Sequence, residues 1–80
     1  MATVRLLYFA SLREAAGRDV EVVDSAAPDL GSLYAEAAAR HALGWPRERL
    51  RVAVDGAFAR WDDALADGSE VAFIPPVSGG

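Results

Sequence analysis

A single long helical pattern, between residues 30 and 42, limits the folds that this chain can adopt. Asp29 stands where it can cap the first turn of the helix, and Gly44 where it can end the last one. A chain of 80 residues forms one domain with a modest core, so this helix must cover one face of whatever sheet the strands form. The apolar stripe follows helical spacing: Leu30, Leu33, Tyr34, Ala37 and His41.

The remaining segments are typical of strands joined by turns. The first is almost wholly apolar (VRLLYFA), which predicts a central strand, and the second (DVEVV) alternates and is rich in valine. Asp55-Gly56 predicts a tight hairpin, and Asp67-Gly68 another turn. The predicted strands are residues 4–10, 19–23, 51–55, 57–61 and 70–74.

A short helix is predicted directly after the first strand. Ser11 and Glu14 fit a capping box, in which each side chain accepts a hydrogen bond from a backbone N–H, and Gly17 suits the end of the helix. The order of elements then predicts an α+β fold: a mixed sheet of about five strands with the main helix across one face. This layout is typical of the ubiquitin-like β-grasp. We assign residues 1–74 to the β-grasp domain and residues 75–80 to a flexible C-terminal tail.

The alternation of side chains leaves an apolar group on the sheet face away from the helix. Arg5, Arg51 and Glu70 should not point into a core, so they mark this outer face. One helix cannot cover both faces, and we therefore predict a protein-binding surface here, the alternative being that loops cover it. The predicted surface consists of Leu7, Phe9, Phe58, Ala72 and Ile74.

Composition excludes several classes of function. The chain has no cysteine, so it can form no disulfide and use no thiolate nucleophile. Its net charge is −4, with no basic run for nucleic acid and no apolar run long enough for a membrane helix. The N-terminus lacks a signal-peptide layout, so we expect a cytoplasmic protein.

Candidate sites for catalysis or metal binding are weak. His41 is the single histidine and has no nucleophile beside it in the pattern, so we expect it to be structural. Asp62, Asp63 and Asp67 match no calcium loop and suit solvated turns, so we expect no metal. Trp45 and Trp61 fit either interface anchors or partly buried residues at the core edge.

The C-terminal segment Pro75-Pro76-Val77-Ser78-Gly79-Gly80 follows the last strand directly. Neither proline can donate to a β-ladder, and two prolines in a row favour a stiff, extended exit. Gly79 and Gly80 lack side chains and can pass through a narrow channel. Fully extended, the segment reaches about 20 Å. An enzyme could therefore hold the Gly80 carboxyl inside its own active site.

Two segments resemble the family of molybdopterin synthase small subunits. Residues 67–80 (DGSEVAFIPPVSGG) look like the family's C-terminal signature, and residues 7–14 (LYFASLRE) resemble its first strand and the turn into its first helix. The length and element order match throughout, whereas residues 19–49 are generic. Asp55 and Ser69 depart from the asparagine and aspartate that the family often has, but both lie at predicted turns.

This resemblance implies a sulfur carrier in molybdenum cofactor biosynthesis. An adenylating enzyme would use ATP and magnesium to activate the Gly80 carboxylate, and a sulfur donor protein would convert it to a thiocarboxylate. The tail would then enter the large subunit of molybdopterin synthase and pass sulfur to cyclic pyranopterin monophosphate. The partners would supply the catalytic side chains, and this chain would bind no cofactor of its own.

Three alternatives share parts of the pattern. A carrier of the thiamine pathway, or another thiocarboxylate carrier, would have the same fold and Gly-Gly end, although the lead-in Pro75–Ser78 and the segment Val71-Ala72-Phe73 favour the molybdenum pathway. A ubiquitin-like modifier would share the activation step but end in an isopeptide bond. A plain β-grasp interaction module would have an inert tail.

Overall fold

Short strands and helices follow one another in the predicted order in the computed structural model, which describes residues 1–76. A 3₁₀ turn at Arg47–Arg49 precedes the third strand. The elements are β1 (Ala2–Tyr8), α1 (Ala10–Ala16), β2 (Val20–Ser25), α2 (Leu30–His41), β3 (Arg51–Val54), β4 (Ala57–Ala59) and β5 (Glu70–Ile74).

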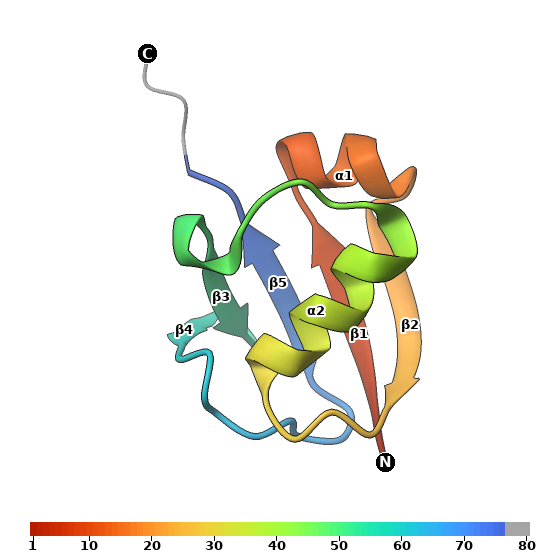
Figure 1. Ribbon diagram of the computed structural model, residues 1–80. Helices are drawn as coiled ribbons and strands as arrows, with labels where there is room; N and C mark the ends of the chain where they lie inside the picture. Colours follow the sequence, from red (N-terminus) through yellow and green to blue (C-terminus); the bar gives the residue numbers. More distant parts are fainter. Residues whose placement is uncertain (77–80) are drawn as a thin grey trace.

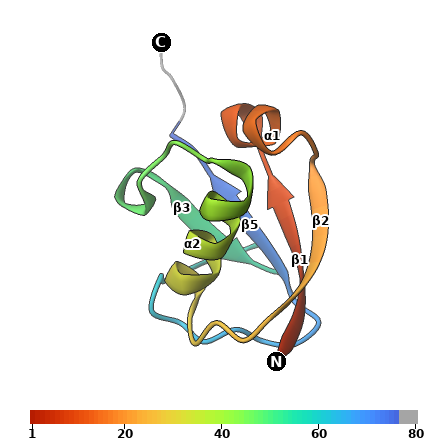
Figure 2. The same cartoon turned by 45° about the vertical axis from the view of Figure 1, so that its right-hand side comes forward.

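The strands of the described chain form one mixed sheet in the order β2-β1-β5-β3-β4 (Figure 1). β1 and β5 pair in parallel, and every other neighbouring pair is antiparallel. The first and last strands therefore lie side by side in the middle of the sheet. α2 crosses one face of the sheet, and α1 sits at the end from which the chain leaves after β5 (Figures 1 and 2). The predicted α+β architecture is confirmed.

The core lies between α2 and the inner sheet face. Val71 and Phe73 of β5 are completely buried there, beside Leu6 and Tyr8 of β1. Phe73 meets the Tyr34 ring edge-on at 5.1 Å between ring centroids. Burying a side chain of this size is worth about 1.5–3 kcal/mol, so the aromatic cluster holds the central strand firmly against the helix.

Two predicted helix ends are confirmed. Asp29 caps α2, its Oδ1 accepting a hydrogen bond from the Ser32 N–H at 2.8 Å. Gly17 ends α1 in the left-handed conformation that glycine tolerates best, with φ at 74°. The tight hairpin at Asp55-Gly56 is also present, because both residues have positive φ and Val54 pairs with Ala57 across the turn.

The predicted capping box is wrong. α1 begins at Ala10, its N-cap is Phe9 without any side-chain cap, and Ser11 lies within the first turn. The Phe9 carbonyl accepts the backbone N–H of Leu12 at 3.0 Å. The Ser11 hydroxyl accepts instead a hydrogen bond from the Trp45 indole N–H at 2.9 Å. The Ser11 hydroxyl oxygen that the local pattern assigned to the helix cap therefore accepts a hydrogen bond from a residue far away in the sequence.

The expected end of α2 at Gly44 is also wrong. The helix ends at His41, and Ala42 takes the left-handed position with φ at 54° while its N–H bonds to the Ala38 carbonyl. Ala42 is exposed to solvent. An alanine therefore occupies, at the surface, a left-handed position that usually favours glycine.

Six strand bounds differ from the prediction: both ends of β1 and β2 and the C-terminal ends of β3 and β4. β2 runs on to Ser25 because Ser25 pairs with Ala2, which also starts β1 earlier than expected. β4 ends at Ala59, since Trp61 turns inward and stacks on Phe73 at 6.2 Å between ring centroids. The bounds of these elements are therefore set by pairing and packing partners that lie far away in the sequence.

Glu21 joins the edge strand β2 to the last turn of α2. Its Oε1 accepts hydrogen bonds from the Tyr8 hydroxyl at 2.8 Å and from Arg40 Nη2 at 3.1 Å, and lies 3.0 Å from His41 Nε2. Burial alone would raise the pKa of Glu21, but the hydrogen bonds from His41, Tyr8 and Arg40 outweigh it and lower the pKa to about 2. The folded state therefore favours the charged carboxylate.

We predict that this carboxylate makes folding stability depend on acid. Because the pKa of Glu21 is lower in the folded than in the unfolded chain, its carboxylate stabilises the folded state fully above about pH 4.5. This contribution to the free energy of unfolding disappears as the pH falls towards 2. Glu21→Gln should lower the free energy of unfolding at pH 7 by about 2–3 kcal/mol and flatten its dependence between those pH values. Denaturant titrations at several pH values measure both effects. Glu14→Gln, on the exposed side of α1, is the control and should change neither; an equal effect of both variants would contradict the prediction.

Candidate functional site

The outer sheet face gathers all five residues predicted for the binding surface. Together with Ala53, Gly56 and Glu70 they line one hollow of about 260 Å³ on the face opposite to α2. We call this hollow the outer groove. The structure thus brings the predicted residues together, while their role in binding stays a prediction. The groove is lined by Leu7, Phe9, Ala53, Gly56, Phe58, Glu70, Ala72 and Ile74.

Small side chains in the middle of the sheet explain the shape of the outer groove. Ala72 of β5 pairs with Ala53 of β3 on one side and with Leu7 of β1 on the other. The short side chains of the two alanines form the floor of the groove, and larger side chains such as Phe58 and Ile74 surround this floor. A protruding apolar side chain of another protein could therefore fit against this floor.

The aromatic walls of the outer groove are open to solvent. Phe58 is 71% exposed and Phe9 is 45% exposed, whereas Phe73 on the inner face is fully buried. Arg5 and Glu70, predicted to mark this face, form an ion pair at 3.5 Å beside the groove. Exposed aromatic side chains bordered by charged ones are typical of a protein-binding surface.

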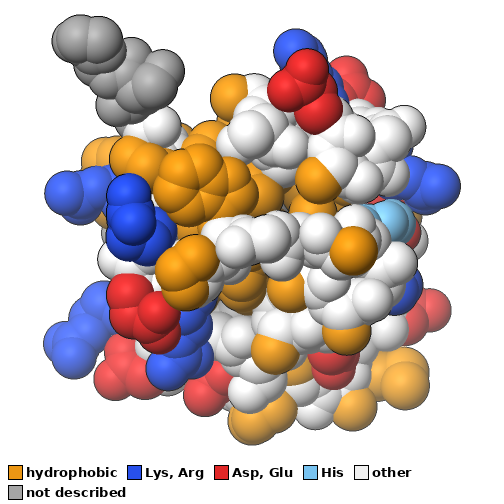
Figure 3. Space-filling model, turned by 45° about the horizontal axis from the view of Figure 1, so that its top comes forward, with side chains coloured by type: hydrophobic (Ala, Val, Ile, Leu, Met, Phe, Trp, Pro, Cys, Tyr) orange, Lys and Arg blue, Asp and Glu red, His pale blue; other side chains and the backbone are white. Residues whose placement is uncertain are grey.

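A second hollow surrounds the base of the tail. Pro75 is buried and Pro76 is exposed, so the chain leaves the packed body at Pro76. Hydrophobic side chains gather beside this point, as Figure 3 shows from the end of the molecule where the chain leaves. We call this hollow the tail groove; it is lined by Phe9, Ala10, Ser11, Trp45, Arg49, Ile74, Pro75 and Pro76. Phe9 and Ile74 border both grooves, which therefore form one continuous surface.

The predicted carrier site lies beyond the described residues. Val77, Ser78, Gly79 and Gly80 follow Pro76, the last residue that the structure describes. What the structure places is the base from which these residues extend, at the end of the central strand β5 (Figure 1). The tail therefore starts from a rigid part of the fold, next to an exposed apolar surface.

The other candidate residues take structural positions. His41 contacts Glu21 and meets the Tyr8 ring edge-on at 5.7 Å between centroids. Asp67 accepts the Thr3 N–H at 2.7 Å, and Asp63 accepts the Arg60 N–H at 3.0 Å. No group of three side chains suited to a metal ion occurs within residues 1–76. In the same part of the chain, no helix has the length and apolar character needed to cross a membrane.

Sequence analysis missed several residues of this surface. The sequence leaves Trp45 open between an interface and a core role, and the structure has it partly buried and lining the tail groove. Arg49 and Arg51 flank the base of the tail. Arg51 was expected on the outer face, whereas Arg49 was not singled out, although a buried leucine between two arginines in the segment Arg49-Leu50-Arg51 turns both outward. Val22 is 63% exposed and pairs with Arg5, which extends the outer face to β2.

Comparison with known proteins identifies the family. Residues 6–80 match the model of the ThiS family. The molybdopterin synthase sulfur carrier subunit of Escherichia coli is 39% identical over 96% of this chain and 99% of its own length. This chain belongs to the ThiS family. Among solved structures, a putative molybdopterin converting factor subunit 1 from Pyrococcus furiosus has 30% identity and a TM-score of 0.80, covering 96% of this chain and 100% of its own.

The solved structure of Caldiarchaeum subterraneum ubiquitin, at 17% identity, has a TM-score of 0.65 over 99% of this chain and 98% of its own, which confirms the predicted ubiquitin-like β-grasp fold. Small archaeal modifier protein 1 of Haloferax volcanii has 26% identity and a TM-score of 0.81, over 96% of this chain and 100% of its own. The family resemblance noted from residues 7–14 and 67–80 is confirmed as well.

The exposed aromatic walls lead to a prediction about stability. Phe58→Ser should lower the free energy of unfolding by less than about 1 kcal/mol, since the ring is largely in solvent and its removal costs mainly the exposed contact with Arg51. Phe73→Ala should cost about 3–5 kcal/mol because it opens a cavity in the core. Thermal or urea unfolding of the two variants beside the parent chain measures the difference. A Phe58→Ser loss as large as that of Phe73→Ala would mean that the outer face belongs to the core.

Proposed function

We propose that this chain carries sulfur on the carboxyl of Gly80 as the small subunit of a molybdopterin synthase. The observation that supports this most is the exit of a Pro75-Pro76 segment from the central strand beside an exposed apolar surface, in a chain of the sulfur carrier family. Such a chain offers a docking surface and an acyl group, while other proteins supply the catalytic side chains.

The chemistry begins with a poor acyl donor. An adenylating enzyme, using ATP and magnesium, would join the Gly80 carboxylate to AMP and release pyrophosphate. Sulfur delivered at the oxidation level of sulfide would then attack the acyl carbon, break the bond to AMP and leave a thiocarboxylate. Enclosing the thiocarboxylate in a partner's channel would keep water away from it. Gly79 and Gly80 suit such a channel because they lack side chains.

The docking partner in this proposal is the large subunit of the synthase. Its channel would take the tail, and its surface would cover the outer groove and the tail groove, which share Phe9 and Ile74. The thiocarboxylate sulfur would bond to a carbon of cyclic pyranopterin monophosphate and displace an oxygen substituent. Water would then cleave the acyl–sulfur bond, which leaves the sulfur on the pterin and returns the Gly80 carboxylate for another cycle. A cytoplasmic location stays a prediction.

The first test concerns the tail itself. The full chain is incubated with an adenylating enzyme, ATP, magnesium and a sulfur donor, and its intact mass and C-terminal fragments are measured. We expect one oxygen of Gly80 to be replaced by sulfur. The chain lacking Gly80 is the control and should stay unchanged. If the mass does not change with active enzymes from both the molybdenum and the thiamine pathway, the inert-tail module is the better interpretation.

The second test concerns docking. Phe58→Ser should raise the dissociation constant for the large subunit about tenfold or more, since exposed aromatic residues that become buried dominate interfaces. Isothermal titration calorimetry with the large subunit measures it. Ala39→Ser, on an exposed position of α2, is the control and should bind like the parent chain. Equal binding by Phe58→Ser and the parent chain would place the interface elsewhere.

A protein modifier is the second candidate, favoured by the likeness to small archaeal modifier protein 1. In that case the Gly80 acyl-adenylate would react with a lysine amine of another protein, form an amide and release AMP. All eight Lys and Arg positions of this chain are arginines, so a second copy offers no lysine as acceptor and chains linked through lysine could not form. Gel analysis of the same incubation with added acceptor proteins distinguishes the two: conjugates favour the modifier, and a thiocarboxylate alone favours the carrier.

A further inference from the structure

We infer that Arg49 and Arg51 form a cationic contact at the base of the tail that pairs with carboxylates around the channel of the large subunit. This inference rests on the proposed function, because it names the protein that would receive the tail. It goes beyond it in assigning a binding role to charged side chains beside the two apolar grooves. The argument depends on where these two side chains lie and on what they leave unpaired.

The arginines of the described chain differ in their partners. Five of them lie within ion-pair distance of a carboxylate: Arg5, Arg18, Arg40, Arg47 and Arg60. Arg13 lies in the last turn of α1, where a cation offsets the partial negative charge of the helix end. Arg49 belongs to the three-residue 3₁₀ turn Arg47–Arg49, which is too short to offer the dipole of a full helix. Within residues 1–76, neither Arg49 nor Arg51 has a carboxylate at ion-pair distance. A chain of net charge −4 thus keeps two arginines without an ion-pair partner along one hollow.

Aromatic rings support both guanidinium groups at the surface. Arg49 Cζ lies 5.7 Å from the centre of the Trp45 ring, and Arg51 Cζ lies 5.6 Å from the centre of the Phe58 ring. The buried Leu50 between them fixes the backbone, so both side chains emerge on the solvent side. Stacking on an aromatic ring leaves the N–H donors at the rim of a guanidinium free for a carboxylate. Both arginines are therefore partly pre-organised for a partner.

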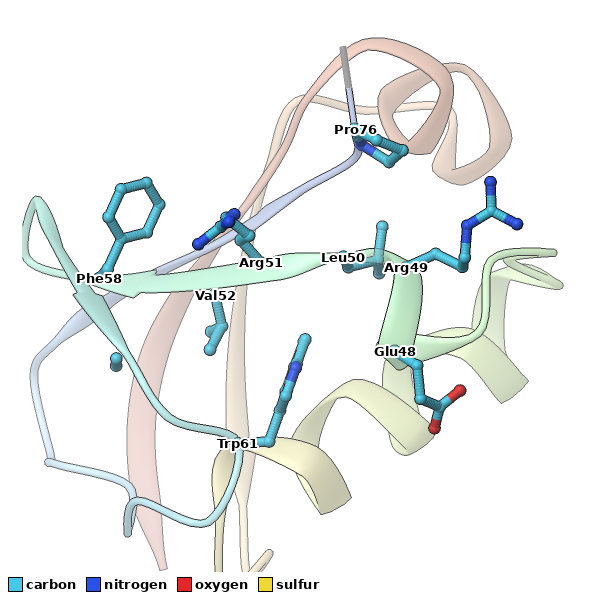
Figure 4. A pocket seen from close by; sticks show the side chains of 9 residues that line it. Glu48, Arg49, Leu50, Arg51, Val52, Phe58, Trp61 and Pro76 are labelled. Atoms are coloured by element: carbon cyan, nitrogen blue, oxygen red, sulfur yellow. The ribbon is translucent and has the colours of Figure 1, made fainter. Parts of the chain in front are cut away.

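The position of the pair links it to the tail. Arg49 and Arg51 line one hollow together with Pro76, and Figure 4 shows Arg49 on the side of Pro76 and Arg51 on the side of Phe58. Arg49 also borders the tail groove, and Phe58 also borders the outer groove. Glu48 is the carboxylate that lines the same hollow, and it lies 3.9 Å from Arg47 Nε. The cationic pair thus sits where the two apolar grooves meet the exit of the chain.

The length of the tail indicates which anion the pair would meet. Four residues follow Pro76, and extended they span about 13 Å. In an inserted tail, the reacting carboxyl and any phosphate of the substrate would then lie deep in the channel, far from Arg49 and Arg51. Protein carboxylates at the channel mouth are the anions within reach. Charges at the rim of an interface mainly raise the association rate and set its salt dependence.

The test measures association kinetics of the full chain with the large subunit of its own synthase by stopped-flow fluorescence. At low salt, Arg49→Gln and Arg51→Gln should each lower the association rate constant about threefold, and the double variant about tenfold. At about 0.5 M salt the difference should shrink below about twofold, because screening shortens the range of the charges. Arg49→Lys and Arg51→Lys keep the charge and should stay within about twofold of the parent chain.

Arg18→Gln removes the same charge on the far side of the sheet, beside β2, and serves as the matched control. It should leave the rate within about twofold of the parent chain. If the parent chain binds, and the double variant associates at the same rate with the same salt dependence, the cationic contact is wrong and the proposed docking stands. An equal loss in Arg18→Gln would also overturn it, since total charge would then explain the effect. If the parent chain does not bind at all, both proposals fail.

Discussion

The parallel pairing of β1 with β5 is the contact on which the rest of this structure depends. It joins the two ends of the sequence in the middle of the sheet, in the register Leu6 with Val71 and Tyr8 with Phe73. All four of these side chains are buried, so a shift of one residue would move them to the solvent face. The same register determines where the chain leaves the domain. A tail that starts from an edge strand would have no such fixed base.

This register also divides β5 into two functions. Val71 and Phe73 fill the core under α2, while Ala72 and Ile74 face outward between β1 and β3. The outward alanine pairs with Ala53, and together they form the low centre of the outer groove. Five residues of one strand therefore supply core packing, part of an exposed apolar surface and the exit of the tail. Such economy is expected in a domain this small, where few residues are available for each task.

Much of the fold was predictable because its signals are local or periodic. The stripe from Leu30 to His41 predicts the helix, and the alternation in residues 70–74 predicts the last strand. Because alternate residues of a strand share a face, the same alternation predicted which side chains line the outer groove. The errors arose where no local pattern decides the structure. Ser11 and Trp61 take positions set by partners far away in the sequence, and Ala42 adopts a left-handed conformation that is rare for alanine. The carrier role of Gly80 came from a family resemblance, since the chemistry of a carboxyl group leaves no periodic pattern. The cationic pair could have been noticed from the segment Arg49-Leu50-Arg51, but its aromatic supports come from two other parts of the chain.

Stability and docking are supported on opposite sides of the molecule. The cluster around Glu21 ties β2 to the last turn of α2, and its members Arg40 and His41 belong to the helix side. The outer groove and the tail base lie on the other face and at the exit of β5, where Phe58 and Pro76 are exposed. Buried, hydrogen-bonded charges cost most when one partner is lost, whereas exposed aromatic and charged groups contribute little to folding. The surface proposed for binding can therefore vary with its partner protein, because the interactions that hold the fold together lie elsewhere.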